Sequence, residues 1–156
     1  MHRVLFVCLG NICRSPMAEG IFRRHVEAAG LTPHFHIDSA GTGNWHVGDP
    51  PDERAQACAT GRGVDITGLR GRQFSVADYE AFDHILVMDS ANLRDVLRLA
   101  RTDADRARVR KFLSFGKGDP DADVPDPYFG GGDGFERVFD MLDEAARGLL
   151  SHVTAP

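Results

Sequence analysis

The sequence lacks several features that define major classes of protein. Its 156 residues contain no apolar run of membrane-spanning length, and the first residues have the pattern of a strand. We therefore expect neither a membrane segment nor a secretory signal. Three cysteines, an odd number, do not suggest the disulfide framework of a small secreted domain. The expected compartment is a reducing cytoplasm.

The sequence also lacks an excess of positive charge, with 18 Lys and Arg against 23 Asp and Glu. The formal net charge is −5 and the basic residues are scattered, so we expect neither nucleic acid nor a membrane as a partner. Hydrophobic residues make up 42% and charged residues 26%, as in ordinary globular proteins. The length suffices for one core, and the chain has no repeat, linker or low-complexity segment. We expect a single domain over residues 1–156 and a monomer.

The pattern of apolar residues predicts strands and helices in alternation. We expect strands over 4–7, 35–40, 84–88 and 109–113, and helices over 16–29, 52–61, 92–101 and 133–153, with a short helix opening at 75–78. Asp133 and Glu136 have the spacing of a capping box at the start of the last helix. This alternation predicts an α/β fold in which helices cover both faces of a parallel sheet.

Polar residues fall where the expected strands end. Cys8 and Ser39 belong to the ends of the first two strands, Asp89 follows the third, and a long loop follows Leu113. Ligands of such folds bind at the carboxyl ends of the strands, so we expect these residues to share one site. Asp89 is suited either to holding a nearby arginine or to capping the helix after it.

The loop between the first strand and the first helix combines an anion site with a nucleophile. Residues 8–15 read Cys-Leu-Gly-Asn-Ile-Cys-Arg-Ser. A strand-to-helix loop directs unpaired backbone N–H groups at one point, where the helix dipole is positive. Gly10 permits a tight turn, and Asn11 tolerates a positive φ. Cys8 begins this loop, and Arg14 stands near its end.

The residue types in this loop predict phosphoryl transfer to a thiolate. The backbone N–H groups, the helix start and Arg14 favour the reactive thiolate of Cys8, and the Ser15 hydroxyl is placed to add a hydrogen bond. Arg14 matches two phosphate oxygens at once. We therefore expect a phosphocysteine intermediate that needs no metal. The alternative is an inert, buried Cys8.

Other interpretations of the loop fit the sequence less well. The Gly-Lys-Ser/Thr ending of a nucleotide-binding loop is missing, and no further Cys or His lies at zinc-ligand spacing near Cys8 and Cys13. The spacing of these two cysteines permits a disulfide under oxidising conditions. Simple packing accounts for Cys13 equally well.

Phosphate-ester hydrolysis also needs a carboxyl group that donates a proton and later accepts one. The long loop offers four candidates: Asp119, Asp121, Asp123 and Asp126. Because Pro127 favours an extended backbone at Asp126, and aromatic residues follow, the residues alone favour Asp126 modestly. Asp119, Asp121 and Asp123 alternate along the chain, but their spacing does not match an EF-hand loop. They are typical of an acidic loop exposed to solvent.

Three aromatic residues are candidate walls of the site: Trp45, Tyr128 and Phe129. Flat side chains around a deep anion site favour phosphotyrosine over the shorter phosphoserine. The alternative for Trp45, the only tryptophan, is that it caps the core.

Residues 7–19, Val-Cys-Leu-Gly-Asn-Ile-Cys-Arg-Ser-Pro-Met-Ala-Glu, resemble the signature of the low-molecular-weight protein tyrosine phosphatases. The likeness extends over nearly the whole chain, through residues 39–42, the Trp45 loop, residues 87–89, residues 126–130 and the last helix. It implies a three-layer α/β/α fold of the flavodoxin or Rossmann type with a four-stranded parallel sheet. It also implies metal-free hydrolysis of phosphotyrosine in proteins, without a cofactor, and binding of inorganic phosphate or a similar oxyanion.

The resemblance implies a role for individual residues. Cys8, Arg14 and Asp126 would be catalytic, with Ser39 and Asp89 in support. Substrate or phosphate would contact Leu9, Gly10, Asn11, Ile12, Cys13, Ser15, Trp45, Tyr128 and Phe129. The family also implies reversible protection of Cys8 by a disulfide with Cys13.

Two positions depart from the family pattern. Phe129 stands where many relatives carry a second tyrosine. In relatives, a serine and a histidine hold the loop asparagine in its strained conformation. Ser39 matches the serine, but Leu69 takes the place of the histidine, so the support of Asn11 is either thinner or rebuilt.

Three other functions remain as alternatives. Relatives that hydrolyse phosphoarginine resemble this chain but carry threonine at the place of Ile12, which favours the tyrosine branch. Arsenate reduction needs two further cysteines near the third strand, and Cys58 stands alone. A phosphate-binding module without catalysis would need neither Cys8 nor Asp126.

Overall fold

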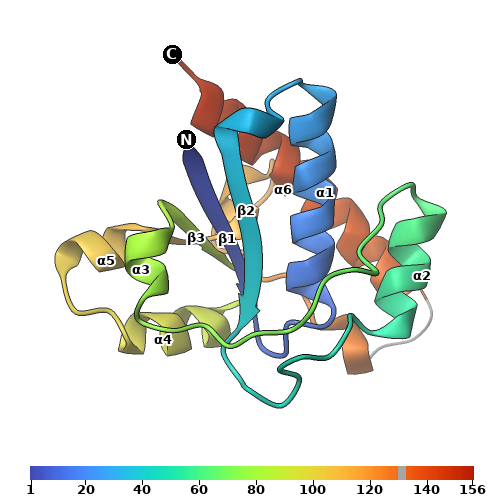
Figure 1. Ribbon diagram of the computed structural model, residues 1–156, viewed down its shortest axis with the longest axis horizontal. Helices are drawn as coiled ribbons and strands as arrows, with labels where there is room; N and C mark the ends of the chain where they lie inside the picture. Colours follow the sequence, from blue (N-terminus) through green and yellow to red (C-terminus); the bar gives the residue numbers. More distant parts are fainter. Residues whose placement is uncertain (130–132) are drawn as a thin grey trace.

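The protein is built on one parallel sheet. The computed structural model describes residues 1–129 and 133–156, without the side chain of Phe129. The strands are β1 (His2–Cys8), β2 (Phe35–Gly41), β3 (His84–Val87) and β4 (Val109–Lys111). Their order in the sheet is β2-β1-β3-β4, and every pair is parallel (Figure 1). The predicted four-stranded parallel sheet is confirmed.

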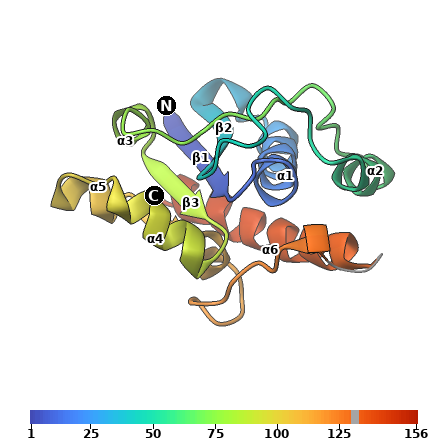
Figure 2. The same cartoon turned by 90° about the horizontal axis from the view of Figure 1, so that it is seen from below.

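Helices cover both faces of the sheet. The helices α1 (Arg14–Ala28), α2 (Glu53–Gly61) and α6 (Gly134–Thr154) lie on one side, and α3 (Asp78–Ala81), α4 (Ser90–Arg98) and α5 (Asp103–Ala107) on the other (Figures 1 and 2). Short 3-10 helices span Thr32–His34, Phe112–Phe115 and Pro127–Phe129. The predicted three-layer α/β/α arrangement is confirmed.

The central strand β1 divides the apolar core into two parts. Val4 and Phe6 pack toward α1 and α6, whereas Leu5 and Val7 pack toward α3 and α4. All four side chains are fully buried. A strand buried on both faces requires the continuous apolar run seen in the sequence, because neither face meets water.

Several expected boundaries shift in the structure. Helix α4 begins and ends earlier than the predicted 92–101, because Asp89 caps it. The fourth strand ends at Lys111, and the buried Phe112 begins a 3-10 turn instead of continuing the strand. Helix α5 and the turn at Thr32–His34 were not predicted. Such short elements lack an apolar period that is long enough to recognise.

The predicted capping box at α6 is wrong. Asp133 is the residue before the helix, but its side chain makes no capping hydrogen bond. The Asp133 carboxylate instead pairs with Arg137, and Glu136 pairs with Arg62 of the segment after α2. Both carboxylates therefore bind arginine side chains, a competition that residue spacing alone does not reveal.

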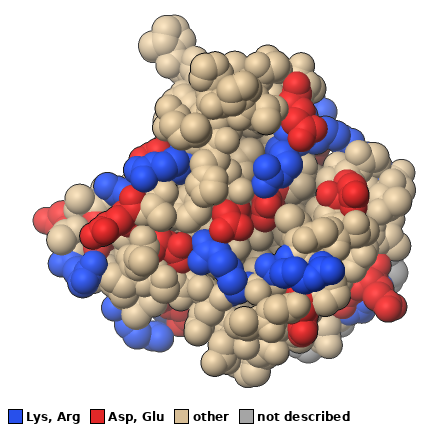
Figure 3. All heavy atoms as spheres, viewed as in Figure 1, with Lys and Arg blue, Asp and Glu red and all other residues tan. Residues whose placement is uncertain are grey.

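Charged side chains of both signs are interspersed on the face shown in Figure 3, without a broad area of one sign. Among the described residues, the search for a helix both long and apolar enough to cross a bilayer finds none.

Gly148 sets how closely α6 approaches the turn after β4. An added Cβ would overlap the backbone carbonyl of Phe115, so the contact exists because residue 148 has no side chain. Phe112 and Leu113, in the same turn, are buried in the core against α6. The glycine lowers helix propensity but permits this contact between main chains.

We predict that Gly148→Ala destabilises the protein although alanine is the better helix former. Overpacking against a backbone carbonyl should lower the free energy of unfolding by about 2 kcal/mol, which corresponds to roughly 6 °C in Tm for a chain of this size. Thermal unfolding followed by circular dichroism measures the change. Gly61→Ala is the matched control, because nothing lies within 4 Å of its added Cβ. A Tm that rises equally in both variants would contradict this packing argument.

Candidate active site

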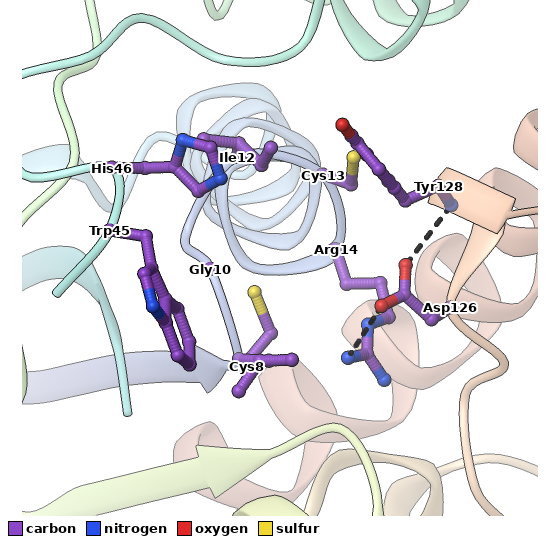
Figure 4. A pocket seen from close by; sticks show the side chains of 10 residues that line it. Cys8, Gly10, Ile12, Cys13, Arg14, Trp45, His46, Asp126 and Tyr128 are labelled. Atoms are coloured by element: carbon purple, nitrogen blue, oxygen red, sulfur yellow. Dashed lines mark hydrogen bonds and ion pairs between the residues drawn. The ribbon is translucent and has the colours of Figure 1, made fainter. Parts of the chain in front are cut away.

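The strand ends converge on a cleft of about 150 Å³. Its lining comes from the loop after β1, the loop after β2 and the loop before α6 (Figure 4). The residues that line it are Cys8, Leu9, Gly10, Ile12, Cys13, Arg14, Trp45, His46, Asp126 and Tyr128. The expected meeting of these segments at the carboxyl edge of the sheet is confirmed.

The loop after β1 surrounds the Cys8 thiol with hydrogen-bond donors. Cys8 is only 2% exposed. Its Sγ lies 3.0 Å from the Ser15 hydroxyl and 3.3 Å from the backbone N–H of Asn11. Asn11 has a φ of 57°, the only positive φ of a non-glycine residue among those described. The chain therefore bends at Asn11 in a conformation that few residues with a side chain adopt.

Gly10 lies in a bend of the chain, as expected, and also leaves room for a neighbouring loop. Its φ is not positive, so the backbone conformation alone does not require glycine. An added Cβ would lie 3.2 Å from Cδ2 of His46, which leaves little room between the loop and its neighbour. Gly10 therefore allows the loop after β2 to approach the loop after β1.

The loop faces the cleft with its N–H groups because its carbonyls are bound on the outside. The backbone N–H groups of Thr42, Gly43 and Asp52 donate to the carbonyls of Cys8, Leu9 and Ile12 at 2.8–2.9 Å. With these carbonyls satisfied elsewhere, the interior of the loop presents donors, which suits a bound oxyanion.

Asn11 is held by three hydrogen bonds, so its support is rebuilt. Its Nδ2 donates to the hydroxyls of Ser15 at 2.7 Å and Ser39 at 3.0 Å. Its Oδ1 accepts from the backbone N–H of Arg72 at 3.0 Å. Leu69 contributes no polar group and packs against the core. A backbone N–H therefore supplies the third hydrogen bond to Asn11.

A second layer of polar groups supports Ser39. Its hydroxyl donates to Oε1 of Glu19 at 2.8 Å, and Arg23 donates to Oε2 of the same carboxylate at 2.7 Å. Glu19 lies in α1 and is buried. Burial raises the pKa of Glu19, although the hydrogen bonds from Ser39 and Arg23 oppose that shift.

Arg14 is buried at the base of the cleft and connects three segments. Its Nη1 donates to Oδ2 of Asp89 at 2.6 Å and to the Val124 carbonyl at 2.9 Å, and its Nη2 lies 3.7 Å from Oδ2 of Asp126. Burial opposes the charge, but Cys8, Asp89 and Asp126 outweigh it and raise the pKa of Arg14.

Asp89 serves both roles considered from the sequence. Its Oδ2 holds Arg14, and its Oδ1 accepts from the backbone N–H of Asn92 at 2.8 Å, which caps α4. One carboxylate therefore fixes the start of a helix and the direction of the arginine.

Of the four aspartates in the long loop, only Asp126 lines the cleft. Its Oδ1 accepts from the Tyr128 N–H at 3.0 Å, and its Oδ2 faces Arg14 (Figure 4). Asp119 accepts from the N–H of Asp121, and Asp123 pairs with Lys111.

The mouth of the cleft is lined by exposed aromatic side chains. Trp45 is 69% exposed and Tyr128 is 43% exposed, so the alternative of a core-capping Trp45 is wrong. The indole lies against Gly43, where an added Cβ would overlap it. The side chain of Phe129 lies outside the part of the chain that the structure describes, and its predicted place at the mouth stays a prediction.

Two residues at the mouth were not predicted from the sequence. His46 lines the cleft, and its Nδ1 lies 3.1 Å from Oδ2 of Asp49. Arg54 lies over the Tyr128 ring at 5.2 Å and donates to the Tyr128 carbonyl at 3.2 Å. His46 could have been proposed from the sequence because it is next to Trp45. Arg54 could not, because its contact with Tyr128 joins residues 74 positions apart.

All three cysteines are free thiols. Cys13 shares the cleft with Cys8, and burial raises its pKa well above the ordinary value. Cys58 lies in α2, where burial raises its pKa to about 11. Among residues 1–129 and 133–156, no three His, Cys, Asp or Glu side chains are grouped as a metal site requires.

Comparison with known proteins extends these observations. A family model described as low molecular weight phosphotyrosine protein phosphatase matches residues 3–156. The low molecular weight protein-tyrosine-phosphatase of Streptomyces coelicolor is 46% identical over 157 residues, covering 97% of this chain and 93% of that protein.

Solved structures agree with the fold. The crystal structure of a protein tyrosine phosphatase from Entamoeba histolytica, with Hepes in its active site, is 35% identical and superposes with a TM-score of 0.93, covering 98% of this chain and 97% of that one. The crystal structure of Drosophila arginine phosphatase is 34% identical with a TM-score of 0.90, covering 97% of this chain and 98% of that one. With the family model matched from residue 3 to the last residue, the chain belongs to the low molecular weight phosphotyrosine protein phosphatases, a family of phosphate-ester-hydrolysing enzymes.

Proposed function

We propose that residues 1–156 act as one catalytic domain that hydrolyses phosphotyrosine in proteins through a phosphocysteine intermediate. The observation that carries this proposal is the meeting of Cys8, Arg14 and Asp126 in one cleft. A nucleophile, a clamp for the phosphoryl oxygens and a proton donor are the three groups that the reaction needs.

In the first step the Cys8 thiolate attacks phosphorus, and the bond from phosphorus to the tyrosyl oxygen breaks. The departing oxygen takes a proton from the carboxyl group of Asp126. Arg14 and the N–H groups of the loop stabilise the charge on the three phosphoryl oxygens that do not react. The Ser15 hydroxyl, 3.0 Å from the sulfur, stabilises the thiolate before attack.

In the second step water attacks the phosphocysteine. The Asp126 carboxylate, now deprotonated, takes a proton from that water as the new P–O bond forms and the S–P bond breaks. Inorganic phosphate leaves, and Cys8 is again a thiolate. The protons balance over the two steps without a further reactant.

The depth of the cleft favours phosphotyrosine as the substrate. Cys8 lies at the base and is nearly inaccessible, whereas Trp45 and Tyr128 line the exposed mouth. A phosphoryl group on an aromatic ring reaches the base while the ring lies between these two side chains. The shorter phosphoserine would draw the peptide backbone into the mouth.

Cys8→Ser should abolish turnover while the fold is retained. A serine hydroxyl is not ionised at neutral pH, so the rate of p-nitrophenyl phosphate hydrolysis should fall by at least about 1000-fold. Circular dichroism and thermal unfolding provide the check on folding. Hydrolysis that continues at the wild-type rate in Cys8→Ser would exclude the phosphocysteine route.

Asp126→Asn should slow the reaction because the amide cannot donate the required proton. We expect kcat for phenyl phosphate to fall by about 100-fold. Asp119→Asn is the matched control, since Asp119 lies in the same loop but does not line the cleft, and it should change kcat by less than about twofold. Equal losses in the two variants would contradict the assignment of Asp126.

Hydrolysis of phosphoarginine is the second candidate function, because the Drosophila arginine phosphatase has the same fold and covers nearly the whole chain. Ile12 lines the cleft, where its branched side chain takes up space beside a bound substrate. Its bulk favours a flat aromatic ring on the substrate.

We predict a higher kcat/KM for a phosphotyrosine peptide than for the matching phosphoarginine peptide. Ile12→Thr should narrow that ratio by about tenfold, since threonine replaces the ethyl branch of isoleucine with a hydroxyl near the guanidinium. Ile12→Val is the control for size alone. A wild-type preference for phosphoarginine would reverse the ranking of the two candidate functions.

A further inference from the structure

The segment that leads to Asp126 is attached to the sheet through one lysine. Lys111, at the end of β4, directs its ammonium group to three oxygen atoms. Its Nζ lies 2.8 Å from Oδ1 of Asp123, 2.8 Å from Oγ of Ser90 and 2.7 Å from the Asp121 carbonyl. The Lys111 side chain is only 12% exposed. All three donor positions of the ammonium group are therefore used.

Asp123 reinforces the same attachment from the loop side. Its Oδ1 also accepts from the backbone N–H of Ser90 at 3.1 Å, at the first turn of α4. The hydrogen bond from Lys111 outweighs partial burial and holds the pKa of Asp123 below its usual range. The Asp123 carboxylate therefore stays charged at neutral pH.

The attachment continues along the backbone to Asp126. The N–H of Val124 donates to the Met88 carbonyl at 2.8 Å, and its carbonyl accepts from Arg14 at 2.9 Å. Prolines at 125 and 127 restrict the backbone on either side of Asp126. Because so little rotational freedom remains between Asp123 and Asp126, the position of the first residue influences the position of the second.

We propose that Lys111 is a positioning residue for proton transfer. By holding Asp121, Asp123 and Ser90 together, it keeps the Asp126 carboxyl directed at the oxygen that leaves the substrate. This inference rests on the proposed role of Asp126 as the proton donor. Lys111 lies outside the set of residues that line the cleft and acts only through the loop.

The basicity of the leaving oxygen distinguishes this role from a general effect on stability. A phenolate is a poor leaving group that needs protonation, whereas a nitrophenolate departs more readily without it. Displacement of Asp126 therefore slows hydrolysis of phenyl phosphate more than hydrolysis of p-nitrophenyl phosphate. Partial unfolding, in contrast, lowers both rates by the same factor.

The first experiment uses Lys111→Met, which keeps most of the aliphatic stem and removes the charge. We expect kcat/KM to fall about tenfold for phenyl phosphate and less than about threefold for p-nitrophenyl phosphate. The inhibition constant of inorganic phosphate should stay unchanged, because it reports the Cys8 loop and Arg14.

The chain offers a matched control in its only other lysine, Lys117. Lys117 lies in the same loop and is exposed, and its ammonium group has no hydrogen-bond partner among the residues that the structure describes. Lys117→Met should therefore leave kcat/KM for both substrates and the inhibition constant of phosphate unchanged. Asp123→Asn, which removes the anion and keeps Lys111, should reproduce the pattern of Lys111→Met and serves in its place if that variant does not fold.

A double-mutant comparison separates this inference from the proposed function. In an Asp126→Asn background, Lys111→Met should have no further effect on phenyl phosphate, since no proton donor remains to be positioned. The inference is overturned if Lys111→Met lowers kcat/KM equally for both substrates, lowers it for neither, or weakens inhibition by phosphate. It is also overturned if Lys111→Met lowers kcat/KM for phenyl phosphate in the Asp126→Asn background as much as in the wild type. If Asp126→Asn alone treats both leaving groups alike, the proposed role of Asp126 fails instead.

Discussion

The left-handed conformation of Asn11 is the constraint on which the rest of the site depends. A φ of 57° costs a residue with a Cβ about 1 kcal/mol or more. Its amide side chain donates to the hydroxyls of Ser15 and Ser39 and accepts from the Arg72 backbone N–H, and these three hydrogen bonds hold the residue there. In that conformation the N–H of Asn11 faces the Cys8 sulfur, and the loop closes around a space for an oxyanion. The support comes from three separate segments, so the loop geometry depends on the completed fold.

Arg14 extends this dependence to the remaining strands. A guanidinium this deeply buried requires partners for its charge and its donors. It finds them at Asp89, beyond β3, and at the Val124 carbonyl in the loop before α6. The requirement to satisfy one buried cation therefore draws the segment of Asp126 to the base of the cleft. In the proposed mechanism, the clamp for the phosphoryl group and the placement of the proton donor share this single residue.

The sequence predicts the parts of the structure that local chemistry decides. The apolar run of β1, the proline in the first turn of α1 and the Gly-Asn turn all belong to one stretch, and their arrangement was expected correctly. From the residues alone Asp126 was one of four candidates, because its selection depends on Arg14, which lies 112 positions earlier. The contacts of Arg54 with Tyr128 and of Lys111 with Asp123 carry no local signal, since arginine and lysine are ordinary surface residues. The capping box failed for the same reason: Arg137 and Arg62 compete for its carboxylates.

The nucleophile and the proton donor are held by different kinds of structure. Cys8 is surrounded by groups within seven residues of itself, Asn11 and Ser15, and Asn11 is held in turn by Ser39 and the Arg72 backbone. Asp126 is positioned by contacts of its loop with β3, β4 and the start of α4. Arg14, which lies 3.7 Å from Asp126, connects the two halves of the site. We therefore expect changes in the long loop to affect protonation of the leaving oxygen more than binding of the phosphoryl group.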